Sequence, residues 1–370
     1  MRAVRRFRVP GGGSIVTAIV TIAILGAGTF IASRPSQLRT PDLEVAMVPD
    51  QASAAVERVA AEPPAPRASA EVATPSIITP PADRGDSPNV IVIRDPSAVA
   101  QNPRLAHLPD RALVEQSEAG PLPVRSADGR RPFDVYARPW SGTRGARVAI
   151  VIGGLGVSQT GTQAAIAKLP PEVTLAFAPQ GNSIGRWMQE ARRTGREIVM
   201  QVPLEPFDFP RVNPGRNTLT VEATPAQNIA NLHWALSRTT NYVGVMNYMG
   251  ARISADRDAF SPIIAELGQR GLLYLDDGSS ARSLAQELSL ANRVPFAAAD
   301  ATIDEARDRA SILDKLDQLE RTARARGFAL GTGSAFDVTV DTVASWIAEA
   351  RRRGIEIVPV SALAIDPEKG

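Results

Sequence analysis

The chain has 370 residues, 44% of them hydrophobic and 22% charged, with a formal net charge of +2 at pH 7. Charge this close to balance argues against nucleic acid as the main partner. The absence of cysteine excludes disulfides, thiolate metal sites and thiol nucleophiles, and two histidines, His107 and His233, leave little scope for a histidine-rich metal centre.

Residues 1–33 combine a basic start with an apolar run. Four arginines, the last at Arg8, precede an uncharged stretch from about Ser14 to Ser33. Roughly 20 such residues suffice to cross a bilayer as a helix, and flanking arginines keep their end in the cytoplasm. We therefore predict a single-pass inner-membrane anchor with the rest of the chain in the periplasm. A signal peptide cleaved near Ala32 is the alternative.

Residues 34–145 are rich in proline, alanine, serine and charge. Fourteen of the 30 prolines lie between Pro63 and Pro139. Such a segment buries too little apolar surface to offset the entropy lost on ordering. The composition predicts a largely disordered periplasmic linker, in which residues 89–94 (N-V-I-V-I-R) form a short strand-like island.

From 146 to 370, apolar runs of strand length alternate with amphipathic helical stretches. The runs lack polar alternation, which is typical of strands buried on both faces in a parallel sheet. The predicted strands lie near 147–152, 173–178, 197–202, 242–247, 272–276, 296–300, 328–331 and 355–360. The clearest predicted helices are Pro225–Arg238, Arg257–Arg270, Asp304–Arg326 and Thr339–Arg353.

Four of the expected helices end in basic residues followed by glycine, and each glycine precedes a strand. Basic side chains suit the negative end of a helix, and glycine suits the left-handed position beyond it. The four glycines are Gly195, Gly271, Gly327 and Gly354. This rhythm predicts an α/β fold, a (β/α) barrel of about seven to eight parallel strands, with a doubly wound open sheet as the alternative. In both folds, ligands bind at the carboxyl ends of the strands.

The first of these strands runs into a glycine-rich turn, V-I-G-G-L-G, at residues 151–156. A dinucleotide fingerprint starting at Gly154 would need its third glycine where Gln159 stands. A P-loop starting at Gly156 would need lysine where Thr162 stands. Both nucleotide-binding motifs therefore fail on an indispensable residue.

Carboxylates follow two later strands. Glu205 lies in the stiff turn P-L-E-P, where it suits a general base or a metal ligand; a turn cap or an ion pair with an arginine is the equally weighted alternative. Asp276 and Asp277 begin the stretch D-D-G-S-S. Two adjacent carboxylates share a proton or hold a divalent cation in some sites, but the same stretch also suits a turn or a helix cap.

The strand near 242–247 ends in N-Y-M-G-A-R. Asn247, Tyr248 and Arg252 offer hydrogen bonds, an aromatic face and a positive charge at the predicted site. His233 falls inside a helical pattern, away from every predicted strand end, and we expect it to be a packed or half-exposed helix residue.

Five segments, taken in order and spacing, resemble the divergent polysaccharide deacetylases, distant relatives of the NodB-type carbohydrate esterases. The resemblance spans about Arg147 to Ala364. It rests on the first strand, on V-P-L-E-P, on Y-V-G-V-M-N-Y-M-G-A-R, on L-Y-L-D-D and on the closing V-P-V-S-A.

The resemblance implies a distorted (β/α) barrel, an envelope location and hydrolysis of N-acetyl groups assisted by a divalent ion held by aspartate and histidine. This chain departs from that pattern. Gly153 and Gly154 stand where typical members carry two aspartates, Tyr248 replaces a histidine, and Gln201 stands where a histidine often occurs. A metal site of the usual composition cannot be built from these residues, so we assign no metal ligand, and the cofactor stays unknown.

The leading hypothesis is a membrane-anchored envelope protein of this family, acting in cell-wall glycan metabolism on peptidoglycan or another N-acetylated polysaccharide. The alternative is a non-catalytic pseudoenzyme that binds glycan or acts as a scaffold for an envelope protein partner. The predicted catalytic residues are Asp276, Asp277 and Glu205, and the predicted substrate-binding residues are Gln201, Asn247, Tyr248 and Arg252.

Overall fold

A computed structural model of the chain describes residues 103–369. The predicted anchor, residues 34–102 of the predicted linker and the strand-like island at 89–94 lie outside the described residues. Among the helices of residues 103–369, none combines the length and apolar character that a membrane span requires.

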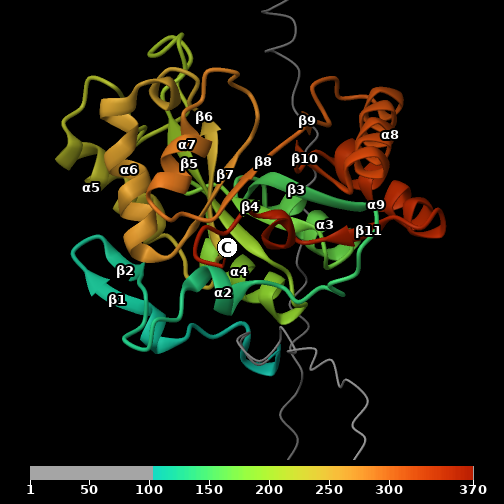
Figure 1. Cartoon of the computed structure of the whole chain (residues 1–370), viewed down its shortest axis with the longest axis horizontal. Coiled ribbons are helices and arrows are strands. Elements are labelled where there is room, and N and C mark those ends of the chain that lie inside the picture. The colour runs from blue at the N-terminus through green and yellow to red at the C-terminus, as the bar shows by residue number, and fades with distance from the viewer. Residues whose placement is uncertain (1–102, 370) are drawn as a thin grey trace, which may run out of the picture. The chain divides into compact units, whose positions relative to one another are not determined.

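The described chain is built around one nine-stranded sheet in which every pair of strands is parallel (Figure 1). Its path runs β8 (Phe296–Ala298), β7 (Leu273–Asp276), β6 (Gly244–Met249), β5 (Ile198–Leu204), β4 (Thr174–Phe177), β3 (Arg147–Leu155), β10 (Phe328–Ser334) and β9 (Ala301–Thr302). The sheet curls into a half-barrel. The predicted α/β fold, a distorted barrel of parallel strands, is confirmed.

Strand β3 lies inside this sheet and pairs with three other strands. One edge pairs with β10 from Arg147 to Gly153. The other edge pairs first with β11 (Glu356–Val358) and then, from Val151 onward, with β4. All eight predicted strands are present, and β10 continues three residues beyond the predicted end at residue 331.

Seven helices of the described chain lie between or after these strands. They are α3 (Gln159–Lys168), α4 (Ile184–Arg193), α5 (Pro225–Leu236), α6 (Arg257–Arg270), α7 (Ala285–Ala291), α8 (Arg309–Arg326) and α9 (Asp337–Arg352). The four predicted helix-end glycines all have positive φ, from 69° at Gly271 to 92° at Gly327. Helix α8 starts later than predicted because Asp308 caps it by accepting a hydrogen bond from the Ser311 N–H.

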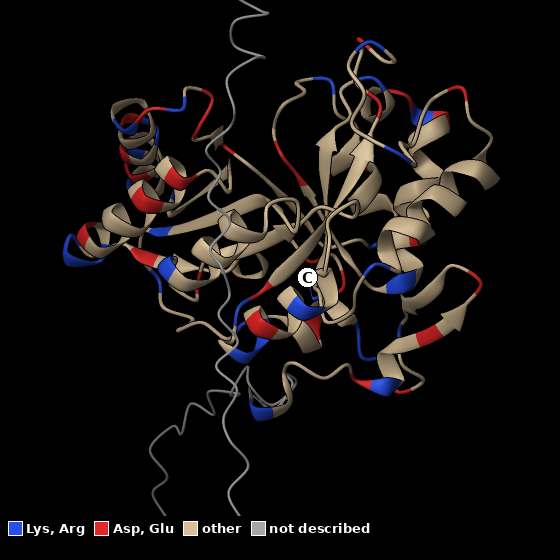
Figure 2. Cartoon of the chain, turned by 180° about the vertical axis from the view of Figure 1, so that it is seen from behind, with Lys and Arg blue, Asp and Glu red and all other residues tan. Residues whose placement is uncertain are grey.

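The two faces of the sheet carry separate apolar clusters, because successive side chains of a strand point to opposite faces. On β3, Val148, Ile150 and Ile152 belong to the cluster that packs against the helices. Ala149 and Val151 belong to the other cluster, inside the half-barrel. Charged side chains gather on the helices and loops, while the strands are largely uncharged (Figure 2).

Residues 103–136 complete the inner cluster, which corrects the predicted boundary at 146. They form β1 (Val114–Ser117), β2 (Gly120–Pro123) and α2 (Pro132–Tyr136), and α2 contributes three buried apolar side chains to that cluster. Arg192 is buried and donates a hydrogen bond of 2.7 Å to the Tyr136 carbonyl. The proline content of this segment suggested a disordered linker. Pro132, however, occupies the first position of helix α2, where proline is favoured.

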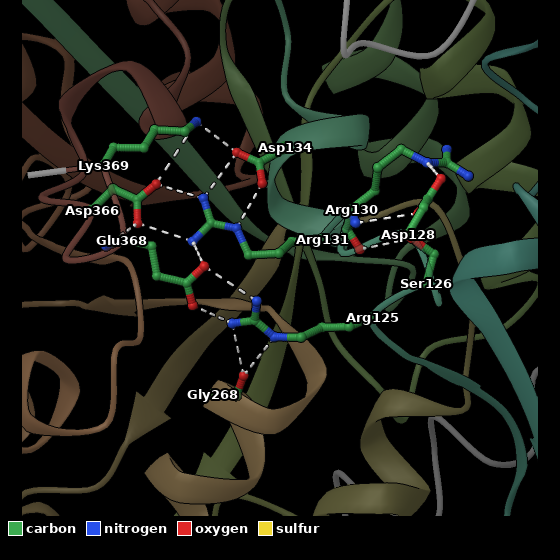
Figure 3. Close-up of polar contacts among 10 residues, drawn as sticks. All are labelled: Arg125, Ser126, Asp128, Arg130, Arg131, Asp134, Gly268, Asp366, Glu368 and Lys369. Carbon is green, nitrogen blue, oxygen red and sulfur yellow. Dashed lines mark hydrogen bonds and ion pairs between the residues drawn. The ribbon is translucent and has the colours of Figure 1, made fainter.

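A cluster of ion pairs, which we call the terminal clasp, ties this segment to the last described residues (Figure 3). Its members are Arg125, Arg131, Asp134, Asp366 and Glu368. Arg131 is only 3% exposed and lies 2.6 Å from Asp134 and 2.5 Å from Asp366, measured between nitrogen and oxygen atoms. Arg125 lies 2.5 Å from Glu368. Two parts of the chain that are distant in sequence are thereby held together.

Candidate functional site

A cavity of about 760 Å³ opens at the carboxyl ends of the strands, where the sequence predicted the site. Its lining comes from the residues that end or follow β3, β4, β5, β6, β7, β9 and β10. This volume falls in the range of small-molecule sites, about 300 to 1,000 Å³. The cavity therefore collects the ends of seven strands into one candidate binding site.

At the end of β3, the glycines make room for a side chain of the neighbouring strand. The Gly154 N–H donates a 2.8 Å hydrogen bond to Oε1 of Gln201, from β5. A Cβ atom added to Gly153 would lie 2.8 Å from Nε2 of Gln201. The Gln201 amide thus occupies the space beside Gly153 that a larger residue would need.

Two backbone N–H groups of the same glycine-rich turn donate hydrogen bonds to other residues of the protein. The Gly154 N–H goes to Gln201, and the Gly156 N–H donates to the Thr162 hydroxyl at 2.8 Å. A phosphate cradle needs such groups to be free for the ligand. This pairing agrees with the failure of both nucleotide-binding motifs.

Two side chains at the end of β6 differ in their surroundings: Asn247 is bonded within the protein, and Tyr248 is accessible from the cavity. Asn247 is 5% exposed; its Oδ1 accepts from the Asp277 N–H and its Nδ2 donates to the Met249 carbonyl, both at 2.8 Å. Asn247 therefore fixes the turn after β7. Tyr248 is 39% exposed and lines the cavity.

The adjacent carboxylates after β7 have different surroundings. Asp276 is buried and accepts hydrogen bonds from the Ser283 hydroxyl at 2.6 Å and the Gly278 N–H at 2.9 Å. Burial raises the pKa of Asp276, and the negative charge of Asp277 adds to this. Asp277 is half-buried, lines the cavity and accepts one hydrogen bond, from the Ser279 N–H at 2.9 Å.

Glu205 and Arg252 form an ion pair beneath the site. Glu205 is 1% exposed; one of its oxygens accepts from Arg252, and the other accepts from the Val221 N–H at 2.6 Å. Arg252 also contacts Glu222 at 2.8 Å. Neither Glu205 nor Arg252 is among the cavity-lining residues, and the geometry is that of the ion pair weighed as the alternative for Glu205.

Of the seven predicted site residues, the structure brings Gln201, Asn247, Tyr248 and Asp277 to the cavity wall, and it places the other three outside the lining. Sequence reasoning missed the polar wall formed by β9 and β10. Its hydroxyl-bearing members are Thr302, Thr332 and Ser334. The only available signal was the run of small and hydroxyl residues G-T-G-S at 331–334.

The donor set does not fit the divalent ion that the resemblance implies. No group of three or more histidines, aspartates or glutamates suited to a metal ion occurs among residues 103–369. Gly153 and Gly154 have no ligating side chain, and Oε1 of Gln201 is engaged. His233 pairs with Glu266 at 2.6 Å, between α5 and α6, and does not line the cavity.

The comparisons with known proteins agree with this architecture. The sequence model of a family described as divergent polysaccharide deacetylase matches residues 150–364. A crystal structure of an uncharacterized protein from Agrobacterium tumefaciens C58 is similar at 56% identity with a TM-score of 0.65, covering 66% of this chain and 99% of that one.

More distant similarity extends to two further proteins. An uncharacterized protein of Haemophilus influenzae is 24% identical over 188 residues, which span 51% of this chain and 66% of that protein. The peptidoglycan deacetylase PdaC of Bacillus subtilis is 13% identical with a TM-score of 0.36, covering 59% of this chain and 90% of that one. Because the family model matches more than half of its length, this chain belongs to the divergent polysaccharide deacetylase family.

Proposed function

We propose that this protein binds an N-acetylated or amino-bearing glycan in the cavity at the strand ends. The observation that carries the proposal is the composition of the cavity wall. Neutral hydrogen-bonding groups, including Gln201 and Thr332, share it with apolar and aromatic surface from Val157, Tyr248 and Phe336. A sugar presents the matching combination, because hydroxyl and amide groups surround a ring whose face packs on aromatic side chains.

Membership of a deacetylase family supports a glycan as the ligand class. The donor set does not support metal-dependent hydrolysis at this site. Asp277 is the only one of the three predicted catalytic carboxylates that lines the cavity, so an acid–base role in a metal-independent reaction would fall to it. Asp276 and Glu205 would act behind it, by holding the turns that carry the site.

Retention of the purified full-length protein on chitin and on peptidoglycan tests the binding proposal. We expect Tyr248→Ala to weaken retention about three- to tenfold, because an aromatic contact contributes about 0.5 to 1.5 kcal/mol. Leu290→Ala is the matched control, since Leu290 is exposed to a similar extent (38%) but lies on α7 and does not line the cavity. Equal retention of the two variants would contradict the proposal, and no retention on either glycan would favour a protein partner.

Acetate release from N-acetylglucosamine oligosaccharides tests catalysis, with zinc, manganese, nickel and cobalt supplied in turn. We expect no release above the protein-free background. Release that falls at least tenfold in Asp277→Ala would instead establish an enzyme.

We also propose that residues 1–33 anchor the protein in the inner membrane and that the folded part acts in the periplasm. The basic flank and apolar run of the sequence support this location. Protease added to spheroplasts should remove the folded part while leaving the cytoplasmic flank protected. Protection of the folded part would refute this topology.

A further inference from the structure

The charge of the cavity wall is one-sided. Within the described chain, none of the cavity-lining residues is lysine or arginine, whereas two are aspartates, Asp277 and Asp337. Arg307 lies over the Phe336 ring, 4.0 Å from Cζ to the centroid, but is not a lining residue. The Arg252 guanidinium forms ion pairs with Glu205 and Glu222. An anionic ligand would therefore meet carboxylates without a compensating cation.

The two aspartates differ in their exposure and in whether a charged side chain interacts with them. Asp337 is exposed at the start of α9, and the charge of Lys168 acts on it. Asp277 is half-buried and has no ion-pair partner among residues 103–369. Its Oδ1 accepts a hydrogen bond from the Ser279 N–H, and its Oδ2 accepts none from residues 103–369. Carboxylates of the same region that are more deeply buried, such as Glu205, are fully engaged by the protein.

Two buried residues of the same wall each carry a polar group that makes no hydrogen bond within the described chain. Gln201 is 6% exposed; its Oε1 is held by the Gly154 N–H, and its Nε2 has no acceptor in the described part of the chain. Thr332 is 3% exposed, and its hydroxyl makes no hydrogen bond to residues 103–369. Both residues line the cavity. Because neither Gln201 Nε2 nor the Thr332 hydroxyl is used by the described part of the protein, both are available to polar groups of a ligand in the cavity.

A carboxylate without an ion-pair partner, in the same cavity wall as available neutral hydrogen-bonding groups, fits a ligand that is polar and carries positive charge. A divalent metal ion is a poor candidate for that charge, because the donors gathered here do not form a metal-binding group. An ammonium group needs only one carboxylate, and a charge-assisted hydrogen bond is among the strongest that a protein makes. Amino sugars combine such an ammonium with hydroxyl groups.

We propose that the cavity distinguishes glycans by charge: it binds saccharides with free amino groups more tightly than their N-acetylated counterparts and rejects anionic ones, and Asp277 is the residue that recognises the ammonium. This inference rests on the proposed glycan-binding function and specifies its ligand. Gln201 and Thr332 bind hydroxyl groups of the same saccharide. The site then recognises glycans from which N-acetyl groups have already been removed.

Calorimetric titration of the full-length protein, purified in a mild detergent, tests this with three tetrasaccharides: of glucosamine, of N-acetylglucosamine and of galacturonic acid. We expect the glucosamine tetrasaccharide to bind at least about tenfold more tightly than the N-acetylated one, equivalent to about 1.4 kcal/mol. The preference should shrink with added salt, because ions screen the attraction. The galacturonic acid tetrasaccharide should not bind measurably.

Asp277→Asn should abolish the preference for glucosamine, so that the first two tetrasaccharides bind with similar affinity, and the turn should persist because asparagine keeps an oxygen for the Ser279 N–H. Asp314→Asn, an exposed site on α8 outside the cavity lining, makes the same change in net charge and should behave as wild type.

Two kinds of outcome separate the inference from the function on which it rests. Equal binding of the first two tetrasaccharides, binding of the galacturonate or a preference that survives Asp277→Asn would overturn charge recognition and leave glycan binding standing. Failure of all three saccharides to bind would overturn the proposed function itself.

Discussion

Because Gln201 packs against Gly153, we predict that Gly153→Ala destabilises the protein when Gln201 is present. In a Gln201→Ala background, the same substitution should be neutral or stabilising. In Gly153→Ala the new Cβ would stand 2.8 Å from Nε2 and 3.3 Å from Cδ of Gln201, so this side chain must move. Moving it breaks the 2.8 Å hydrogen bond to the Gly154 N–H. Gly153 is not among the glycines with positive φ, so alanine meets no backbone strain there.

The expected magnitudes follow from these two contacts. Leaving the Gly154 N–H without its partner costs about 1 to 3 kcal/mol. Replacing glycine by alanine at an unstrained position returns about 0.4 to 1 kcal/mol, because it reduces the entropy of the unfolded chain. Gly153→Ala alone should therefore lower the free energy of unfolding by up to about 2.6 kcal/mol, with a mid-range value of about 1.3 kcal/mol. In a Gln201→Ala background the contact is absent, and the same substitution should be neutral or stabilising.

Urea unfolding of the four proteins of this double-mutant cycle, followed by tryptophan fluorescence and compared at a common m-value, measures the coupling. Gly185→Ala on α4 is the matched control, because its added Cβ meets no atom within 4 Å. That control should be slightly stabilising in both backgrounds. If Gly153→Ala destabilises the protein equally with and without Gln201, the steric reasoning is refuted.

Three further predictions concern buried charge and are measured by the same urea titrations. Arg131→Met should lower the free energy of unfolding by up to about 3 to 5 kcal/mol, because it removes the buried partner of Asp134 and Asp366 and leaves them, among the described residues, only the exposed Lys369. Lys168→Met, which breaks an exposed ion pair, should cost less than about 1 kcal/mol, and similar costs would contradict the importance of the clasp. Burial alone would raise the pKa values of Asp134 and Asp366, but the hydrogen bonds and positive charge of Arg131, together with Lys369, outweigh it and leave both pKa values lowered. Their stabilisation is therefore present above the ordinary aspartate pKa of 3.8 and lost as the pH falls through the lowered pKa values, and an acid limb of unchanged size in Arg131→Met would argue against this. For Asp276, whose pKa burial raises, stability should instead fall as the pH rises from 3.8 through the raised value, and Asp276→Asn should remove that slope.

The fold could be predicted because its signals are local. Helix α6 has the bounds that the sequence suggested, Arg257–Arg270, with the Asp256 side chain capping its start and left-handed Gly271 ending it. Every strand of the sheet except the two-residue β9 was visible as an apolar run. Residues 103–136 escaped prediction because their order comes from burial under the half-barrel, not from local pattern.

The site was harder to predict because its contacts are between distant residues. Glu205 pairs with Arg252, 47 positions along the chain, and Gln201 pairs with Gly154, also 47 positions away. No spacing rule links such partners, so a carboxylate at a strand end looks the same in sequence whether it faces a ligand or an arginine. Asp276 and Asp277 illustrate this, since only the second reaches the cavity.

The terminal clasp also sets an order for the synthesis of this chain. Arg131 and Asp366 are separated by 235 residues, so the arginine leaves the ribosome long before its partner exists. At about 5 to 20 residues per second, the delay is roughly 12 to 47 s. Throughout that interval α2 can fold locally but cannot be locked in place. The inner cluster of the half-barrel is therefore closed last, by residues at both ends of the described chain, and in a nascent chain that stops before Asp366 the pairing of Arg131 is limited to Asp134.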